Sequence, residues 1–197
     1  NSYKTVSVVI VQPNIDPYND KFNWDFKYQF EKSIKILDGT VGQKTDFIIF
    51  PETFITENID EETISSREEI NWFRDSLIRK FPRVKIITGA NTYVIYKSDS
   101  AASSTARKDE RGIYFDVYNT ALQIDSTQVE IYHKSKLVPG VERMPFPALL
   151  KPLESFAINM GGTMGSLGTQ PQRSVFTNKA NEASIAPVVC YESIFAD

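Results

Sequence analysis

The feature that most constrains the fold is the alternation of short apolar runs with helical repeats. Residues 5–11, 46–50 and 84–96 are rich in β-branched and aromatic side chains, as buried strands are. Between the first two runs, apolar residues recur at the spacing of one helix face: Phe26, Phe30, Ile34 and Leu37. This alternation is typical of an α/β fold in which helices cover a sheet.

The rest of the chain continues the same pattern. Ile70 to Leu77 predicts a second helix that ends near Phe81, and residues 114–124 and 129–137 predict two strands around the turn Asp125–Ser126. The last strand candidates are residues 175–176 and 183–190. No internal repeat is visible, so we expect a single domain over residues 1–197.

Two segments differ from this pattern. Residues 98–112 lack large apolar side chains and predict a mobile hairpin tip, to which we assign no function. Residues 138–170 combine proline and large apolar residues with a glycine-rich stretch at 161–168. This stretch is not a phosphate loop, because no Gly-Lys-Ser/Thr follows it.

Composition excludes several classes of protein. A formal charge of −3 and 41% apolar content describe a globular chain without the basic surface that nucleic acids require. The longest apolar runs, at 8–11 and 47–50, are far below the roughly 20 residues that span a bilayer, and no signal peptide opens the chain. We therefore expect this polypeptide to be soluble. Because Cys190 and His133 are the sole cysteine and histidine, an internal disulfide and a histidine-rich metal site are excluded.

Polar residues follow three apolar runs, and reactive groups gather at strand ends in open α/β folds. These residues are Glu52, Lys134 and Cys190. A structural interpretation stays open for each, because a lone cysteine after an apolar strand is often buried. His133 could also be the base for a cysteine nucleophile. In an extended strand, however, residues 132, 134 and 136 face one way and 133 and 135 the other, which separates His133 from Lys134.

Three motifs resemble those of the nitrilase, or carbon–nitrogen hydrolase, superfamily: FPETF at 50–54, YHKSKLVPGVERMPF at 132–146 and PVVCYESIFAD at 187–197. The long second motif, QPNID at 12–16 and the Cys-Tyr-Glu-Ser sequence are similar to its apolipoprotein N-acyltransferase branch. The resemblance covers nearly the whole chain in order. It implies an α-β-β-α sandwich.

The resemblance also implies roles for individual residues. Cys190 would be the nucleophile, Glu52 the general base and Lys134 the stabiliser of the oxyanion, with Glu142, Tyr191 and Glu192 as supporting residues of the active site. The implied reaction moves an acyl chain from a phospholipid, through a cysteine thioester, to the α-amine of a diacylglyceryl-cysteine that begins a bacterial lipoprotein. It implies no cofactor and no metal.

Lipid substrates need an apolar path to such a site. We interpret residues 138–170 as a lid or arm on the membrane surface, in which Phe146 and Leu149 contact lipid. Packing on the core is the alternative interpretation of the leucines. Phe22 and Trp24 lie where the family places an aromatic residue near its active site.

Two departures from the family pattern affect these expectations. Lys136 stands where family members often carry histidine. Family enzymes embed this domain between transmembrane helices and continue it beyond the nucleophile, so we expect a fragment that lacks the C-terminal part and is inactive alone. The whole protein would lie in the inner membrane with this domain facing the periplasm. The alternatives are a soluble nitrilase-type amidase that uses the same three residues and a non-catalytic lipid- or peptide-binding domain.

Overall fold

The computed structural model describes residues 5–16, 24–143, 166–178 and 182–195. Seven strands form the main sheet: β1 (Val8–Ile10), β2 (Phe47–Ile49), β3 (Ile55–Asp60), β4 (Lys85–Ile95), β5 (Arg107–Lys108), β6 (Tyr114–Ile124) and β7 (Val129–His133). A separate antiparallel pair consists of β8 (Phe176–Asn178) and β9 (Ala183–Ile185). The main helices are α1 (Phe26–Leu37) and α2 (Glu68–Phe73), which continues into a π turn at Arg74–Ile78. Short 3-10 helices cover Ile64–Ser66, Asp99–Ala101 and Cys190–Ile194.

The main sheet is mixed, with the strand order β1-β2-β4-β6-β5. β1, β2 and β4 are parallel, whereas β6 runs antiparallel to both β4 and β7. β3 extends the β2 side of β4, because it pairs with residues 90–93 after β2 has paired with 85–87. α1 connects the parallel strands β1 and β2, as a crossover helix does.

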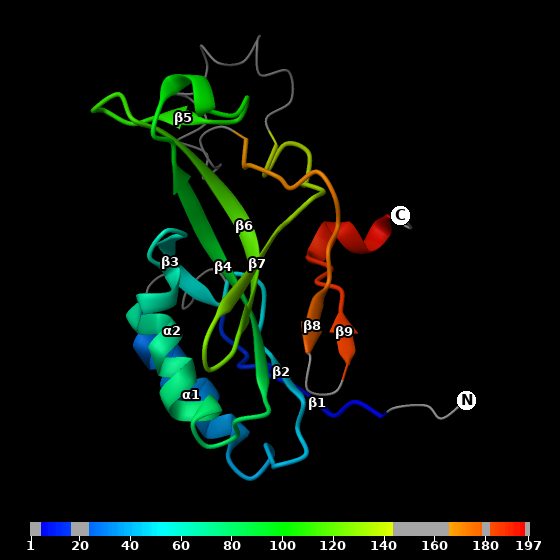
Figure 1. Ribbon diagram of the computed structural model, residues 1–197. Helices are drawn as coiled ribbons and strands as arrows, with labels where there is room; N and C mark the ends of the chain where they lie inside the picture. Colours follow the sequence, from blue (N-terminus) through cyan, green and yellow to red (C-terminus); the bar gives the residue numbers. More distant parts are fainter. Residues whose placement is uncertain (1–4, 17–23, 144–165, 179–181, 196–197) are drawn as a thin grey trace.

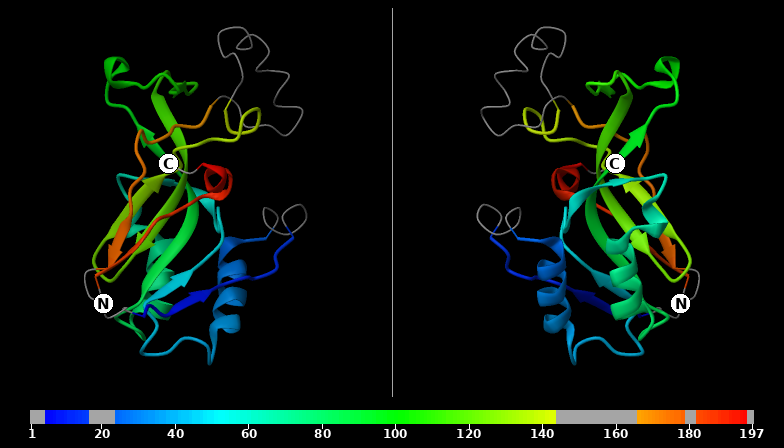
Figure 2. Two further views of the ribbon diagram at one scale, coloured as in Figure 1. Left: turned by 90° about the vertical axis from the view of Figure 1, so that its right-hand side faces the viewer. Right: turned by 90° about the vertical axis from the view of Figure 1, so that its left-hand side faces the viewer.

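Helices cover one face of the main sheet and the β8–β9 pair lies over the other. Figure 1 shows α1 and α2 on one side of the sheet and β8–β9 on the opposite side, and Figure 2 shows the molecule from each of these two sides. The core on the helix side includes the ring contact of Phe30 with Phe73, 4.9 Å between centroids. The second core joins Phe47, Tyr132 and Phe176. The α/β class is confirmed, and the layers are consistent with a nitrilase-like sandwich.

Predicted and observed elements agree best where the apolar pattern is regular. The α1 helix covers Phe26–Leu37 and ends at Asp38–Gly39, where Gly39 has a φ of 75°. β6 covers the predicted residues 114–124. β3 was not predicted from the sequence, because ITENID has only two apolar residues, Ile55 and Ile59, and lacks the apolar/polar alternation that indicates a strand. β7 ends at His133 rather than 137, and β9 ends at Ile185 rather than 190.

The segment at 98–112 has some local structure: a 3-10 turn at Asp99–Ala101 and the short strand β5. The buried carboxylate of Asp116 anchors it by accepting hydrogen bonds from the hydroxyls of Ser103 and Thr105 at 2.5 and 2.8 Å. Its mobility stays a prediction. Of the proposed arm, only 138–143 and 166–170 lie within the described residues. In the described part of the chain, no helix has the length and apolar character needed to cross a bilayer.

Candidate active site

Glu52 is held by a tight turn after β2. The backbone remains paired with β4 past the end of the strand, because Phe50 N donates to Ile87 O at 2.8 Å and Gly89 N donates to Pro51 O at 3.1 Å. A Cβ atom on Gly89 would lie 2.7 Å from the Cα of Glu52, so only glycine permits this approach. The turn projects the Glu52 side chain beyond the sheet edge, where 36% of its surface stays exposed.

Lys134 follows β7 directly and is almost completely buried. Its backbone N–H donates to Asn119 O at 2.9 Å, and its side chain is 1% exposed. The Nζ atom lies 2.9 Å from Glu142 Oε1 and 3.4 Å from Glu52 Oε1. Burial lowers the pKa of Lys134, but the hydrogen bond to Glu142 and the charges of both carboxylates outweigh it and raise that pKa above its usual value. The lysine is therefore held as a buried ammonium between two carboxylates.

Asn119 completes this group, and the sequence analysis missed it. Its Nδ2 donates to Glu52 Oε1 at 2.7 Å and to Glu142 Oε1 at 3.0 Å, so the amide and the Lys134 ammonium bridge the same two oxygens. Asn119 is 4% exposed and stands in the middle of the apolar strand β6. A lone amide in a buried strand needs partners, and that was the available signal.

Glu142 lies in a turn that also anchors the start of the arm. Its Oε2 accepts a hydrogen bond from Val138 N at 2.8 Å, and its backbone oxygen accepts one from Leu167 N at 2.9 Å. Burial raises the pKa of Glu142, but the hydrogen bonds from Lys134, Val138 N–H and Asn119 prevail and lower it. The Glu142 carboxylate is thus the ionised counter-ion of Lys134, and its backbone joins residues 138–143 to residues 166–168.

Cys190 begins the 3-10 helix Cys190–Ile194 in a strained conformation. Its φ is 48°, in the left-handed region, which costs a residue with a side chain about 1 kcal/mol. The residue is exposed and forms no disulfide. The preceding residues 186–189 extend from β9 without strand pairing among the described residues. A sharp turn therefore presents the thiol at the surface.

Glu192, two residues later, ties this turn to Lys134. Its Oε2 accepts a hydrogen bond from Val189 N at 2.9 Å, next to the cysteine, and its Oε1 accepts from Ser135 N at 2.8 Å and Ser135 Oγ at 2.6 Å, next to the lysine. Tyr132 Oη also donates to Oε1, at 2.7 Å. The Glu192 side chain is thereby the physical link between the segments that carry Lys134 and Cys190.

These contacts shift the pKa values of both partners of the buried Tyr132–Glu192 hydrogen bond. Burial raises the pKa of Glu192, but the hydrogen bonds from Ser135, Val189 N–H and Tyr132 outweigh it, so that pKa lies below its usual value. Burial and the same carboxylate raise the pKa of Tyr132 to about 12. Tyr132 is therefore a neutral donor to an ionised acceptor over the physiological range of pH.

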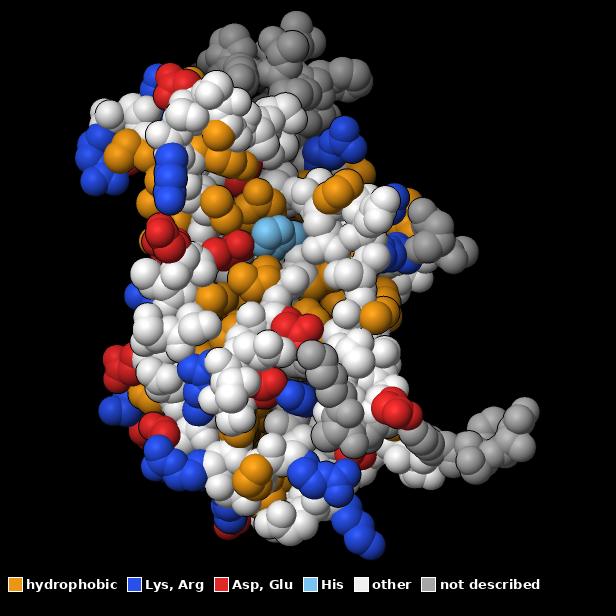
Figure 3. Space-filling view, in the orientation of Figure 1, with side chains coloured by type: hydrophobic (Ala, Val, Ile, Leu, Met, Phe, Trp, Pro, Cys, Tyr) orange, Lys and Arg blue, Asp and Glu red, His pale blue; other side chains and the backbone are white. Residues whose placement is uncertain are grey.

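His133 lies on the opposite face of the sheet from Lys134. Its Nε2 is 2.6 Å from Glu61 Oε1, and its ring stacks on Tyr118 at 3.8 Å between centroids. The histidine, pale blue in Figure 3, shows only a small surface among apolar and acidic side chains. The predicted separation of His133 from Lys134 is confirmed. The prediction for Ser135 was wrong, because the strand ends at His133 and Ser135 turns to the same carboxylate as Tyr132.

The structure thus brings Glu52, Lys134 and Glu142 into direct contact. Glu192 does not contact Lys134 itself but binds the next residue, Ser135. The approach of the Cys190 sulfur to them stays a prediction. Tyr191 packs edge-on against Phe195, with 5.4 Å between the ring centroids.

Of the four residues predicted to contact lipid, the structure describes only Trp24. Trp24 contacts Tyr28 of α1 at 5.1 Å between ring centroids, and the Lys32 ammonium lies over its ring. Its described contacts are thus with the helix layer. Phe22, Phe146 and Leu149 lie outside the described residues, so the substrate-binding role of all four aromatic and apolar residues remains a prediction.

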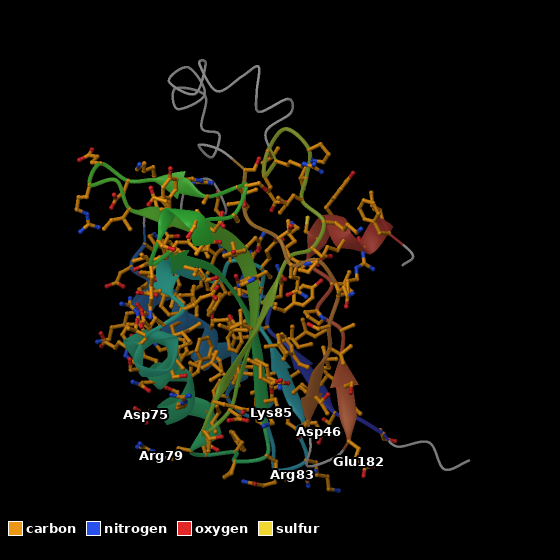
Figure 4. All side chains as sticks on the ribbon, turned by 45° about the horizontal axis from the view of Figure 1, so that its top comes forward. Asp46, Asp75, Arg79, Arg83, Lys85 and Glu182 are labelled. Carbon is orange, nitrogen blue, oxygen red and sulfur yellow. The ribbon has the colours of Figure 1, made fainter. Side chains whose placement is uncertain are left out.

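Other ionic groups lie away from this site. Asp46, Arg83 and Lys85, labelled in Figure 4, gather where β2 and β4 begin, whereas Glu52 follows the end of β2. There Arg83 pairs with Asp46 at 3.4 Å and Lys85 with Asp125 at 2.5 Å. In the described part of the chain, no group of three or more histidine, cysteine or acidic residues is placed to hold a metal ion.

Comparison with known proteins identifies the family of this chain. A sequence model of the carbon–nitrogen hydrolase family matches residues 7–197. Two curated relatives are the apolipoprotein N-acyltransferases of Chlorobaculum tepidum, 28% identical over 205 residues, and Haemophilus influenzae, 26% identical over 200 residues. The alignments cover 99% and 98% of this chain but 36% and 33% of the relatives, so the chain spans about a third of their length.

A solved structure shows a similar fold. It is a CN-hydrolase superfamily protein from Xanthomonas campestris with an arsenic adduct in its active site, and it is 19% identical to this chain with a TM-score of 0.51. The match covers 95% of this chain and 54% of that protein.

Proposed function

Because the chain belongs to the carbon–nitrogen hydrolase family, we propose that it carries the catalytic residues of an N-acyltransferase that matures lipoproteins. The acyl donor would be a phospholipid, and the acceptor would be the α-amine of an N-terminal diacylglyceryl-cysteine. The observation that carries the proposal is the buried Lys134 ammonium, which contacts both Glu52 and Glu142.

The two carboxylates differ in burial, and this difference supports a separate role for each. The Glu142 side chain is 14% exposed and lies closer to Nζ, so it acts as the permanent counter-ion of Lys134. The Glu52 side chain is 36% exposed and lies farther from Nζ, so it can receive a proton from a group that approaches the site. In this proposal Glu142 neutralises Lys134, and Glu52 acts as the general base.

In the first half-reaction, Glu52 takes the proton of the Cys190 thiol and the thiolate attacks an ester carbonyl of the phospholipid. Lys134 and the backbone N–H of Tyr191 stabilise the negative charge on the tetrahedral oxygen. When the C–O bond breaks, Glu52 returns its proton to the departing alkoxide. The products are a lysophospholipid and an acyl thioester on Cys190.

In the second half-reaction, the neutral α-amine of the lipoprotein attacks the thioester carbonyl. Glu52 takes a proton from the nitrogen, and the C–S bond breaks to release Cys190 as a thiolate, which recovers the proton from Glu52. The result is an amide, and the enzyme returns to its starting state. Because water would hydrolyse the thioester, the arm at 138–170 is proposed to shield it on the membrane surface.

The experiment uses the full-length protein with phosphatidylethanolamine and a synthetic diacylglyceryl lipopeptide. Mass spectrometry should detect an acyl adduct on the peptide that contains Cys190 and an amide-linked third acyl chain on the lipopeptide. Cys190→Ala should abolish both signals. Acyl transfer that persists in this variant would refute the role of the thiol.

The same experiment separates the alternatives. A nitrilase-type amidase would use Glu52, Lys134 and Cys190 on a small amide, release ammonia and form no lipopeptide product. A non-catalytic lipid- or peptide-binding domain would form no adduct, and its Cys190 would react with maleimide as slowly as an ordinary thiol. The proposed periplasmic orientation in the inner membrane is tested by protease digestion of spheroplasts, which should cleave this domain from outside.

A further inference from the structure

A second polar network lies behind the candidate active site, on the helix-covered face of the main sheet. Glu61, next after β3, accepts hydrogen bonds at 2.6 Å from Thr92 Oγ1 on β4 and at 2.6 Å from His133 Nε2 on β7. The hydroxyls of Thr92 and Thr120 are 2.7 Å apart. This back network therefore joins β4, β6 and β7 to the end of β3.

The back network and the active site occupy the same position on opposite faces. Thr120 and His133 are directly paired residues of β6 and β7. Their neighbours Asn119 and Lys134 are joined through the backbone, because Lys134 N donates to Asn119 O at 2.9 Å. Because side chains alternate along a strand, residues 120 and 133 project to the back while Asn119 and Lys134 reach the carboxylates at the front.

His133 is fixed by several groups at once. Besides Glu61, its ring stacks on Tyr118 of β6, and its backbone N–H donates to Gln170 Oε1 at 2.8 Å. It is the last residue of a five-residue strand, where a ladder is prone to fray. Its side-chain contacts hold the strand end from which Lys134 extends.

We propose that Glu61 and His133 form a positioning pair for acyl transfer, a role that rests on the proposed function. The pair fixes Lys134 and Asn119 from behind the sheet. The front geometry tolerates little movement, because the 3.4 Å between Lys134 Nζ and Glu52 Oε1 is already near the limit of a hydrogen bond. Neither Glu61 nor His133 contacts the reacting atoms, so their effect acts through Lys134 and Asn119.

Two substitutions at His133 separate the hydrogen bond from the packing. His133→Phe keeps a ring to stack on Tyr118 but removes the donor to Glu61. His133→Gln restores an N–H at nearly the position of Nε2 without a ring. The control is Gln123→Met, which removes a 2.7 Å hydrogen bond to the Glu130 carboxylate between the same two strands, at their other end.

The assay measures thioester formation on Cys190 in the full-length protein over a range of phospholipid concentrations. We expect His133→Phe to lower kcat by roughly 10- to 100-fold, with KM within about 2-fold of the parent, because the lysine is misplaced rather than the lipid site. His133→Gln should recover most of this loss. Gln123→Met should leave kcat unchanged although it lowers the unfolding midpoint.

The outcomes are distinguishable. Equal kcat in the parent and in His133→Phe overturns the positioning role while the proposed function stands. A fall in kcat that Gln does not rescue, or that Gln123→Met reproduces, shows a merely structural role and also overturns it. Absence of the thioester from the parent protein overturns the proposed function, and this role with it.

Discussion

Glu192→Gln is the substitution that most directly tests how the Cys190 turn is attached to the rest of the domain. The carboxylate is 1% exposed and accepts four hydrogen bonds, three at Oε1 and one at Oε2. Glutamine has the same shape, but it is neutral and replaces one acceptor oxygen with an N–H donor. If Oε1 keeps its three partners, the new amide faces the N–H of Val189, which is also a donor.

The expected loss of stability in Glu192→Gln follows from these four contacts. Hydrogen bonds to a charged group contribute about 1.5–3 kcal/mol each and neutral ones about 1 kcal/mol, so loss of the charge weakens every contact and the Val189 contact becomes unfavourable. We expect Glu192→Gln to lower the free energy of unfolding by about 3 kcal/mol, a large fraction of the stability of an ordinary domain.

Urea unfolding of the parent and the variant at neutral and acidic pH measures this loss. The folded-state pKa of Glu192 lies below its usual value of 4.5, so its stabilising effect is present above pH 4.5 and is lost as the pH falls through the lower, folded-state pKa. The variant has no carboxylate to titrate, so the difference between the two proteins should shrink on acidification. Glu130→Gln is the control, because that carboxylate accepts amide donors in a half-buried position.

Two results would refute this reasoning. One is a variant as stable as the parent at neutral pH, which would mean that the four contacts contribute nothing net. The other is a stability difference that widens as the pH falls, because an ionised acceptor can lose its advantage only when it is protonated.

Three further predictions concern single substitutions. Glu142→Gln should lower the pKa of Lys134 and slow thioester formation by roughly 10- to 100-fold in a mass-spectrometric time course, because the ammonium loses its nearest counter-ion; an unchanged rate would contradict this. Gly89→Ala should destabilise the fold by about 1–3 kcal/mol in urea unfolding, since its Cβ meets the backbone of Glu52, whereas Gly42→Ala, with nothing nearby, should not. Burial raises the pKa of Asp125, but Lys85 and backbone N–H groups outweigh it and hold that pKa at about 2, below the usual 3.8 of an aspartate, so Asp125→Asn should be less stable than the parent at neutral pH. The parent should lose the same stability as the pH falls from 3.8 through 2. Equal unfolding midpoints of the two proteins at pH 7 would contradict this prediction.

Local patterns predicted the elements that depend on local interactions. The apolar face of α1 and the long apolar strand β6 fix their own limits, because their side chains repeat with the period of the element. β7 ended early for a reason that lies elsewhere in the chain. Lys134 N still donates to Asn119 O, but the next residue, Ser135, turns to Glu192, 57 residues later, and the Lys134 side chain is held by Glu52, 82 residues earlier. Nothing in residues 129–137 contains that information.

The residues of the candidate site were likewise predicted only in part. Motifs at strand ends and the resemblance to a family identified Glu52, Lys134 and Glu142, which the structure brings into contact. Asn119 was missed, because a single amide in an apolar strand belongs to no motif, although it contacts both carboxylates. Glu61 was missed for the opposite reason. It lies in a run of acidic residues, Asp60 to Glu62, where the half-buried member that binds His133 cannot be distinguished by sequence from its neighbours.

Several contacts that assemble the two polar networks join distant parts of the chain, although Lys134 and Glu142 are only 8 residues apart. The separation is 82 residues for Glu52 and Lys134, 72 for Glu61 and His133, and 60 for Tyr132 and Glu192. Closing such loops costs entropy that a single polar contact does not offset, so we expect the apolar cores to form first and the carboxylates to make their contacts within a sheet that is already folded. Near the Cys190 turn, Val188 and Ile194 are 51% and 67% exposed, and Val189 packs against the second core only partly buried, so apolar burial at the turn itself is limited. Glu192→Gln should therefore release residues 186–195 before it unfolds the sheet, and amide hydrogen exchange should lose protection at Glu192 N–H while the β4–β6 ladder keeps it.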